Sequence, residues 1–487
     1  MHANRRLVAV FPCPASVLGL LLVAIVSSPG CGKSEGTHEM SRKGRPQAQQ
    51  PKEDKLSLRW REEGLRHASA TNEFIRRGLR EGWENVRDAD EPQETRQPLA
   101  QAVLDAIRRA NASGDVDDLQ QRFPRAHHPF HQMLRENGQG LPVSLLLDDG
   151  RIIVRIGGPY RPSEVVIIDD RTIKQLSREV LWVSRSLNRE FFAIARGNGI
   201  SIHRGWEGPE TAFLKWPTGL EGIPRGYQVE PSDEGQIITQ LIPFDTGDKA
   251  LLAGPDGVFV LQTDRSVRLL PTEDELLDGW LDNDRPSSFH LDMEHGAISP
   301  DGKLIAAGHQ SSQHYVFDAD SFEIVATIGH LSEYPRHAVF SADGSLIAFN
   351  SCHFYNGITF AVPTKLLPGL KTEDYKLDDR LIQLDDEASV YASFARSEDF
   401  IVGDADGWLR AFDHGGKLRW QHLIGSSVGA IDVSRDGKRL IVTTYAGFLS
   451  ILDLDTGEAD PYAISTATHQ ERRRWLFWAT EPKPLIW

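Results

Sequence analysis

Short apolar runs alternate with polar turns from about residue 141 to about residue 465. The runs are rich in Val, Ile and Leu, and the turns between them contain Asp-Gly, Asn-Gly or Gly-Pro pairs. Runs of this length, separated by residues that reverse the chain, are typical of antiparallel strands joined by tight hairpins. No long helical period interrupts them. The pattern predicts an all-β domain over residues 141–465.

This region contains an internal repeat. Three segments align, and they read HGAISPDGKLIAAGHQSSQHYVFD (295–318), HAVFSADGSLIAFNSCHFYNGITF (337–360) and AIDVSRDGKRLIVTTYAGFLSILD (430–453). Each has a strand, a Ser-x-Asp-Gly turn, a second strand, a polar turn and a third strand. A period of about 40 residues with this content is typical of a four-stranded propeller blade.

The number of blades can be counted from the first turn of the repeat. It recurs near seven positions, which are Asp149, Asn188, Thr246, Asp301, Asp343, Glu398 and Asp436. The wider gaps hold polar or Pro/Gly-rich inserts at 216–235, 271–289 and 363–380. Seven units close into a ring without an exposed sheet edge. The sequence therefore predicts a seven-bladed β-propeller.

Residues 56–140 have a helical pattern instead. Apolar residues from Leu58 to Trp83 recur at spacings that fit one helix face, and Pro98 opens a second such run. A third, shorter run is broken by Pro124 and Pro129. We expect a small helical collar that packs on the propeller, with a partner-binding helix as the alternative.

The last residues, 466–487, combine Arg with Trp475, Phe477, Trp478 and Trp487. Arg beside aromatic residues is compatible with a nucleic-acid or membrane contact. We favour a strand or hook that buries its indoles against the propeller and closes the ring.

The N-terminus has the layout of an export signal. Arg5 and Arg6 precede an uncharged apolar stretch, and small residues follow it up to Cys31. The unbroken apolar part, residues 17–26, is too short for a stable membrane-spanning helix. Residues 31–55 are Gly, Ser, Gln, Pro and charge with little to bury, which predicts a flexible tether.

Composition limits the classes of function. The chain has 487 residues and a formal net charge of −15, so general binding to nucleic acid is not expected. Its three Cys residues cannot supply a disulfide framework. We find no catalytic motif such as GxSxG, HExxH or GxxxxGK[ST], and no sequence signature that requires a cofactor.

Two resemblances add to this picture. The Gly30–Cys31 junction resembles the cleavage box of bacterial lipoproteins, which implies removal of residues 1–30 and lipidation of Cys31; a plain signal peptide is the alternative. Ser28 departs from the Leu that the family usually has there. Gly32 implies the outer membrane rather than retention in the inner membrane. The expected location is the bacterial cell envelope, facing the periplasm, with the membrane contacted through the N-terminal lipid.

The aligned units resemble WD40-type and YVTN-type propeller repeats, although none ends in Trp-Asp itself. In that family the first strand of each blade lines the central channel, and the turns between second and third strands share one face with the links between blades. The resemblance implies a binding face that contains His295, His309, His314, His337, Cys352, His353, Asp404, Asp406 and Tyr445.

This face allows three kinds of function. The default is a non-catalytic platform that binds an envelope protein, peptide or other ligand. A metal site formed by His309, His314, Cys352 and His353 is a second hypothesis. A propeller enzyme is the third, either lactonase-like or hydrolase-like, or quinoprotein-like because residues 406–425 resemble the repeat of pyrroloquinoline-quinone dehydrogenases. Only Asp432 places a carboxylate on the first strands of the three aligned units.

Overall fold

The computed structural model describes residues 50–87, 90–158, 163–223, 236–281 and 290–487. The predicted signal segment, Cys31 and most of the predicted tether lie outside these described residues. Among the described helices, none is both long enough and apolar enough to cross a membrane.

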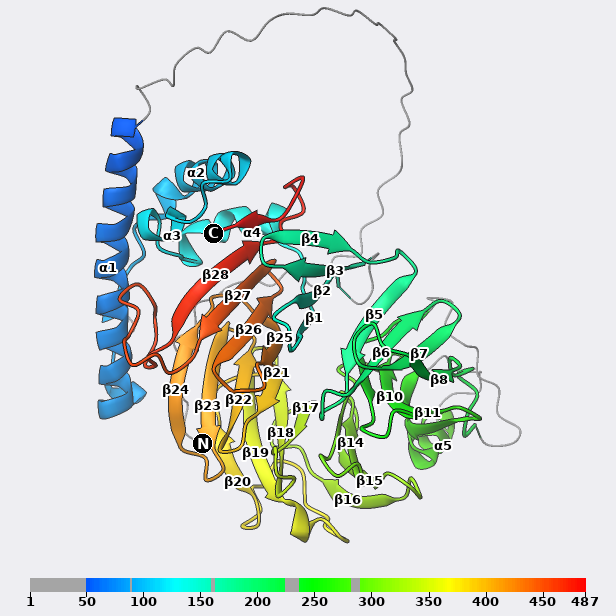
Figure 1. Ribbon diagram of the computed structural model, residues 1–487. Coiled ribbons are helices and arrows are strands. Elements are labelled where there is room, and N and C mark those ends of the chain that lie inside the picture. The colour runs from blue at the N-terminus through cyan, green and yellow to red at the C-terminus, as the bar shows by residue number, and fades with distance from the viewer. Residues whose placement is uncertain (1–49, 88–89, 159–162, 224–235, 282–289) are drawn as a thin grey trace, which may run out of the picture.

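The strands form seven antiparallel sheets (Figure 1), and each sheet is built from strands consecutive in the chain. The first four sheets consist of β1 (Val143–Leu146), β2 (Ile152–Ile156), β3 (Glu164–Asp169) and β4 (Thr172–Gln175); β5 (Val180–Arg185), β6 (Phe191–Arg196), β7 (Gly199–Arg204) and β8 (Glu210–Leu214); β9 (Gln240–Pro243), β10 (Lys249–Gly254), β11 (Gly257–Gln262) and β12 (Ser266–Leu270); and β13 (His295–Ile298), β14 (Leu304–Gly308), β15 (His314–Asp318) and β16 (Ile324–Ile328).

The remaining sheets consist of β17 (Tyr334–Phe340), β18 (Leu346–His353), β19 (Asn356–Pro363) and β20 (Ile382–Asp385); β21 (Val390–Ala395), β22 (Asp399–Asp404), β23 (Trp408–Asp413) and β24 (Leu418–Leu423); and β25 (Val428–Val433), β26 (Arg439–Thr444), β27 (Phe448–Asp453), β28 (Gln470–Leu476) and β29 (Leu485–Ile486).

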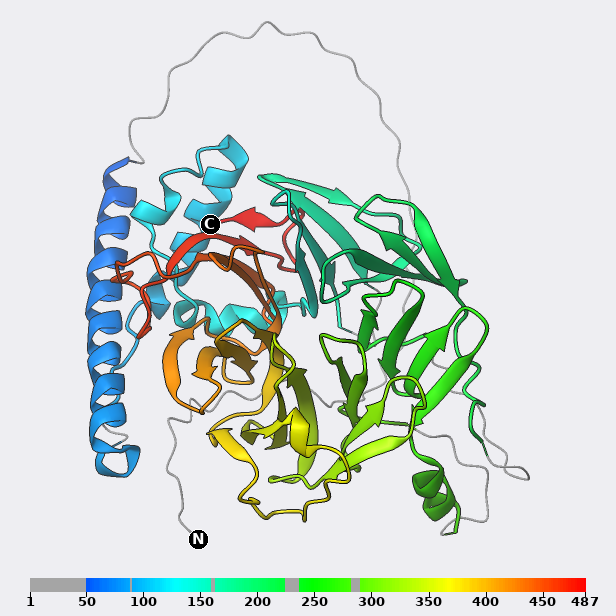
Figure 2. The ribbon, with the colours of Figure 1, turned by 60° about the horizontal axis from the view of Figure 1, so that its bottom comes forward.

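The sheets are arranged as a closed ring of blades (Figure 2). The first strand of every blade contacts the first strand of the next, and β25 of the seventh blade contacts β1 of the first. The predicted seven-bladed β-propeller is therefore confirmed.

The repeated Ser-x-Asp-Gly turn has a local physical cause. In the fourth blade, Ser299 Oγ donates to Asp301 Oδ1 at 2.7 Å and accepts from the Leu304 N–H at 2.9 Å. Gly302 follows with φ of +71°, a conformation that favours glycine. The seven turns used to count the blades all lie between the first and second strands.

Most of the core lies between neighbouring blades. Leu251 and Val260 of the third blade pack with Ile305 and Phe317 of the fourth, and similar clusters fill the other seams. Each sheet buries side chains on both faces, which explains why the strands are so uniformly apolar. The ring is held together mainly by side chains that pack between sheets.

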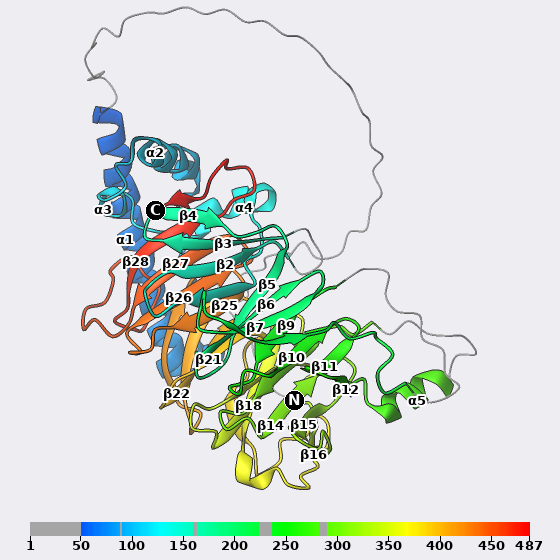
Figure 3. The same ribbon diagram turned by 45° about the vertical axis from the view of Figure 1, so that its right-hand side comes forward.

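The helical segment precedes the ring, as expected. It consists of α1 (Gln50–Glu81), the 3-10 turns η1 (Trp83–Asn85) and η3 (Gln97–Leu99), α2 (Ala100–Ser113), α3 (Leu119–Arg122), η4 (His128–Phe130) and α4 (His131–Asn137). Helix α1 begins at Gln50, inside the range expected for the tether. We call residues 50–137 the helical collar. Figure 3, read with Figure 1, places it at the side of the ring, beside the seventh blade.

The C-terminal residues belong to the seventh blade. Strand β28 pairs with β27, so the residues after 465 add the two outer strands of this sheet. Trp475 and Phe477 pack between the seventh and first blades, at the seam that closes the ring. Trp478 and Trp487 pack against the collar instead. These aromatic side chains are all at most 2% exposed.

The insert at 271–289 contains a helix that we did not expect, α5 (Glu273–Leu281). Its start is a capping box, because the Thr272 N–H donates to Glu275 and the Glu275 N–H donates to the Thr272 hydroxyl. The Thr-Glu-Asp-Glu sequence could have revealed this helix. A further 3-10 turn, η5 (Thr364–Leu366), follows β19.

Candidate functional site

One face of the ring carries the turns between second and third strands together with the links between blades. We call it the loop face. It contains the turns after β6, β10, β14, β18, β22 and β26. The corresponding turn of the first blade includes Pro159 and Tyr160, which lie outside the described residues. The predicted site residues are distributed over four blades of this face.

Three of the predicted histidines are packed between strands and do not project from the loop face. His295 opens β13 with its ring 5.7 Å from that of His314, and His314 also packs on Phe349. His337 Nε2 lies 2.7 Å from the Ser393 hydroxyl, across the seam between the fifth and sixth blades. Burial lowers the pKa of His295 to about 3 and that of His337 to about 4, so both rings are neutral at pH 7.

The four residues of the metal hypothesis have separate partners. His309 Nε2 lies 3.6 Å from Glu275 of α5, and His314 Nε2 lies 3.0 Å from the Ser351 hydroxyl. His353 pairs with Glu333 at 2.5 Å, while Cys352 is 1% exposed. Within the described ranges, no three His, Cys, Asp or Glu side chains are placed to share a metal ion.

The remaining predicted residues lie on the sixth and seventh blades. Asp404, at the end of β22, is 1% exposed and forms a buried ion pair with Arg410. The Asp406 N–H donates to Asp404 Oδ1 at 2.9 Å, so both residues are part of one tight turn. Tyr445 is 39% exposed, and its ring lies 5.9 Å from that of Tyr391.

The carboxylate of Asp432, on the first strand of the seventh blade, is bonded to groups of two other blades. Its oxygens lie 2.9 Å from an Arg185 nitrogen and 3.2 Å from an Arg189 nitrogen, and the Leu146 N–H donates to it at 2.6 Å. It therefore joins the seventh blade to the first and second. This geometry assigns Asp432 to ring closure.

Aromatic side chains gather on the loop face at the fourth and fifth blades, and two of them are highly exposed. His330 and Tyr375 have ring centroids 4.9 Å apart, and His353 contacts both Tyr334 and Phe354. Phe354 is 75% exposed and Tyr375 is 65% exposed. We call these five residues the aromatic patch.

The insert after β19 brings Tyr375 to this patch. It runs parallel to β16 through a bridge between Lys371 and Thr327, and the Tyr375 N–H then donates to the His330 carbonyl at 2.8 Å. The insert thereby covers part of the outer edge of the fourth blade. Its last turn also supplies Asp374, which is 3.4 Å from His330 Nε2, beside the patch.

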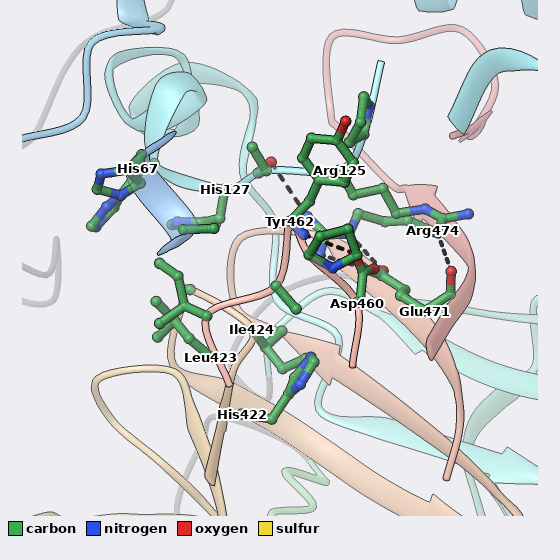
Figure 4. Close-up of a pocket in the computed structure, with 18 of the residues that line it drawn as sticks. His67, Arg125, His127, His422, Leu423, Ile424, Asp460, Tyr462, Glu471 and Arg474 are labelled. Carbon is green, nitrogen blue, oxygen red and sulfur yellow. Dashed lines mark hydrogen bonds and ion pairs between the residues drawn. The ribbon is translucent and has the colours of Figure 1, made fainter. Parts of the chain in front are cut away.

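A second candidate site is a cavity between the collar and the last two blades, which we call the collar pocket (Figure 4). Its volume is about 410 Å³. Its walls come from α1, the segment 120–128, the end of β24 with residues 424–425, the loop 460–464 and β28. Gly425 permits this docking, since its φ is +103° and a Cβ there would lie 2.3 Å from the His127 ring.

The charged groups of the collar pocket are mostly paired with one another. Arg474 forms two hydrogen bonds with Glu471, at 2.8 and 2.9 Å. Arg125 donates only to backbone carbonyls, those of Glu471, Arg472 and Trp487. Burial lowers the pKa of Arg125 to about 10, so it keeps its charge at neutral pH.

Histidines supply the uncharged polar surface of the collar pocket. His127, His128 and His422 line it, and burial lowers the pKa of the last two to about 4 and that of His127 well below its usual value. Neither ring nitrogen of His127 has a hydrogen-bond partner in the structure, and Nδ1 of His422 has none either.

No pattern in the sequence predicted this pocket. Its walls are separated by hundreds of residues, and no repeat or motif connects them. One local signal was present, the run Arg-Ala-His-His-Pro-Phe-His at 125–131, which places three histidines in a helical segment otherwise interpreted as packing surface. No protein-family model matches the chain, and no curated protein sequence matches it as a relative.

Proposed function

We propose that the protein is a lipid-anchored, periplasm-facing protein of the bacterial cell envelope that binds a segment of another protein on the loop face of its propeller, without catalysis. The aromatic patch carries this proposal. Large apolar side chains that are exposed as a group are typical of interaction sites. The β-propeller supplies a rigid frame for them.

The charges around the aromatic patch indicate which residues the bound protein segment contains. Glu333 and Asp374 lie beside the rings, and only histidines of the patch face them as ion-pair partners among the described residues. Glu373 lies next to Asp374 but is paired with Lys376 at 3.3 Å. Aromatic faces and carboxylates both attract cations. We therefore propose a partner segment that combines Arg or Lys with apolar residues.

Site-specific crosslinking tests this function. A photoreactive phenylalanine analogue at position 354, in the full-length protein in its native envelope, is expected to crosslink one protein in stoichiometric amount. The same analogue at Leu187, which is 52% exposed in the turn after β5 on the opposite face, is the matched control. Tyr375→Ala should reduce the yield at position 354. Equal crosslinking from both faces, or none from position 354, would contradict the proposal.

Lipidation is tested separately. Cys31→Ser removes the only group that the lipoprotein signal can modify, so the variant should lose incorporation of labelled palmitate and leave the membrane fraction. Two acyl chains make anchoring stable, whereas a folded propeller without them has no such hold. Density separation of the membranes should place the wild-type protein in the outer membrane. An unmodified wild-type protein would show that the segment is a plain signal peptide.

A further inference from the structure

The collar pocket has the properties of a small-molecule site, and the proposed function does not use it. Its volume of about 410 Å³ lies in the range of ligand cavities. Gln121 is exposed at its border, and Tyr462 and Gln470 are half-buried, so the pocket reaches solvent. A ligand can therefore enter without separation of the collar from the ring.

The charges in the pocket leave little attraction for a charged ligand. Its lining contains three guanidinium groups and three carboxyl groups, which are Arg96, Arg125, Arg474, Glu94, Asp460 and Glu471. Arg96 is 2.6 Å from Glu94, and Arg474 is paired with Glu471. Burial raises the pKa of Asp460 while Arg125 lies near it, so these last two groups also offset one another.

The unused hydrogen-bonding capacity belongs to uncharged groups. His127 and His422 are neutral at pH 7 and have ring nitrogens without partners. A neutral imidazole offers one donor and one acceptor. The side-chain amides of Gln120 and Gln470 each donate one N–H to a backbone carbonyl, and each retains a second N–H and a carbonyl oxygen. Buried polar groups without partners are unfavourable, so a ligand with hydroxyl groups would be stabilised here.

Apolar groups complete the lining. Leu423, Ile424 and Pro124 form part of the wall, and Tyr462 adds an aromatic ring. A ligand that matches this surface is uncharged, has groups that both donate and accept, and also has apolar faces. Hydroxyl groups on a saturated ring meet these requirements.

We propose that the collar pocket binds a neutral saccharide of one or two sugar rings. Sugar hydroxyls pair with the imidazoles and amides, and the ring faces pack on Leu423 and Tyr462. This site is separate from the aromatic patch, and the proposal stands if no protein binds to that patch.

Calorimetric titration of the full-length protein in detergent tests it. The probes are N-acetylglucosamine and its β-1,4-linked dimer, with glucosamine as a cationic probe and glucose 6-phosphate as an anionic probe. We expect saturable binding of a neutral probe and weaker binding of both charged ones. Ala463→Phe should fill the pocket and weaken binding at least about tenfold, because Ala463 lines the pocket in a surface loop.

The control is Ala112→Phe, the same change at an exposed position of α2 away from the pocket, which should leave affinity unchanged. Tyr462→Ala is a second variant in case Ala463→Phe unfolds, and it should also weaken binding. Absence of heat with both neutral probes, tighter binding of a charged probe, or unchanged affinity in a folded Ala463→Phe variant would each overturn the proposal.

Discussion

Single buried charges connect blades that share no backbone hydrogen bonds. Asp432 of β25 contacts Arg185 and Arg189 of the second blade and the backbone of the first. The Asp432 side chain is 4% exposed, and that of Arg185 is 7% exposed. Removal of one partner from such a group leaves the other charges buried without compensation.

We expect Asp432→Asn to lower the free energy of unfolding by about 3–5 kcal/mol, because both arginines lose their carboxylate. Urea denaturation measures this change. Asp264→Asn is the matched control, since this residue is exposed in the turn between β11 and β12 and should change stability by less than about 0.5 kcal/mol. Similar stability of the two variants would exclude the role of Asp432 in ring closure.

At the scale of elements, the collar is joined to the ring through an interface rich in neutral histidines. His127 and His128 come from the segment before η4 and from η4 itself, and His422 comes from β24. His469, which precedes β28, lies behind His422 inside the ring, with ring centroids 6.1 Å apart. Burial lowers the pKa of His128, His422 and His469 to about 4. The arginines of the collar pocket lie near this group and add to the unfavourable effect of a proton.

This arrangement makes the collar sensitive to acid. The unfolded chain protonates its histidines near pH 6.5, whereas the folded protein resists until about pH 4. Stability should therefore fall as the pH falls through this window, by up to about 1.4 kcal/mol per histidine for each pH unit. Hydrogen exchange at pH 7 and pH 5 should show the loss of protection first in α1 and α2.

The contribution of one histidine is isolated by His422→Gln, which retains a polar side chain that does not titrate. Its free energy of unfolding should depend less on pH than that of the wild-type protein between pH 7 and pH 4.5. A comparison of the two proteins is needed because Asp385 has the opposite effect on the free energy of unfolding. Burial raises its pKa to about 7, so its protonation stabilises the folded protein as the pH falls. Parallel pH profiles for the two proteins would contradict the assignment.

At the scale of the whole molecule, the collar and the end of the chain share one core. Trp60, Ile107 and Phe130 of the collar pack with Leu476 and Trp487. We expect Ile107→Ala to lower the free energy of unfolding by about 2–5 kcal/mol and to increase hydrogen exchange in β28 and β29. Leu79→Ala, at a position of α1 that is 48% exposed, is the control and should change neither quantity. If Ile107→Ala increased hydrogen exchange in α2 alone, the collar would unfold separately from the seventh blade.

The seven-bladed ring could be predicted from the sequence because each blade is formed by residues that are close together in the chain. The Ser-x-Asp-Gly turn forms within six residues in three of the blades, and the polar turn at the equivalent position marks the first hairpin of the other four. The aromatic residues after 465 predicted a strand or hook that closes the ring, and β28 is such a strand. The turn spacing could not assign it to a blade, since a loop of 16 residues separates β27 from β28.

The candidate sites were less predictable for a related reason. Register placed His295 and His337 on first strands, whereas His314, expected in a turn, opens β15. Register could not show that neighbouring blades would enclose these rings. The aromatic patch depends on an insert that folds back along β16, and the collar pocket depends on contacts between residues such as Arg125 and Glu471. Only the folded ring brings these groups together.

Because its parts are far apart in the sequence, the core shared by the collar and the seventh blade is completed late. The apolar faces of α1 and α2 leave the ribosome early, whereas Phe448, Leu476 and Trp487, which cover them, come last. Contacts so distant in sequence form slowly, and uncovered apolar surface favours aggregation in the meantime. On the proposed export route, a periplasmic chaperone that holds the emerging helices until the strands of the seventh blade follow would meet this need, and its depletion should harm this protein more than a propeller without the helices.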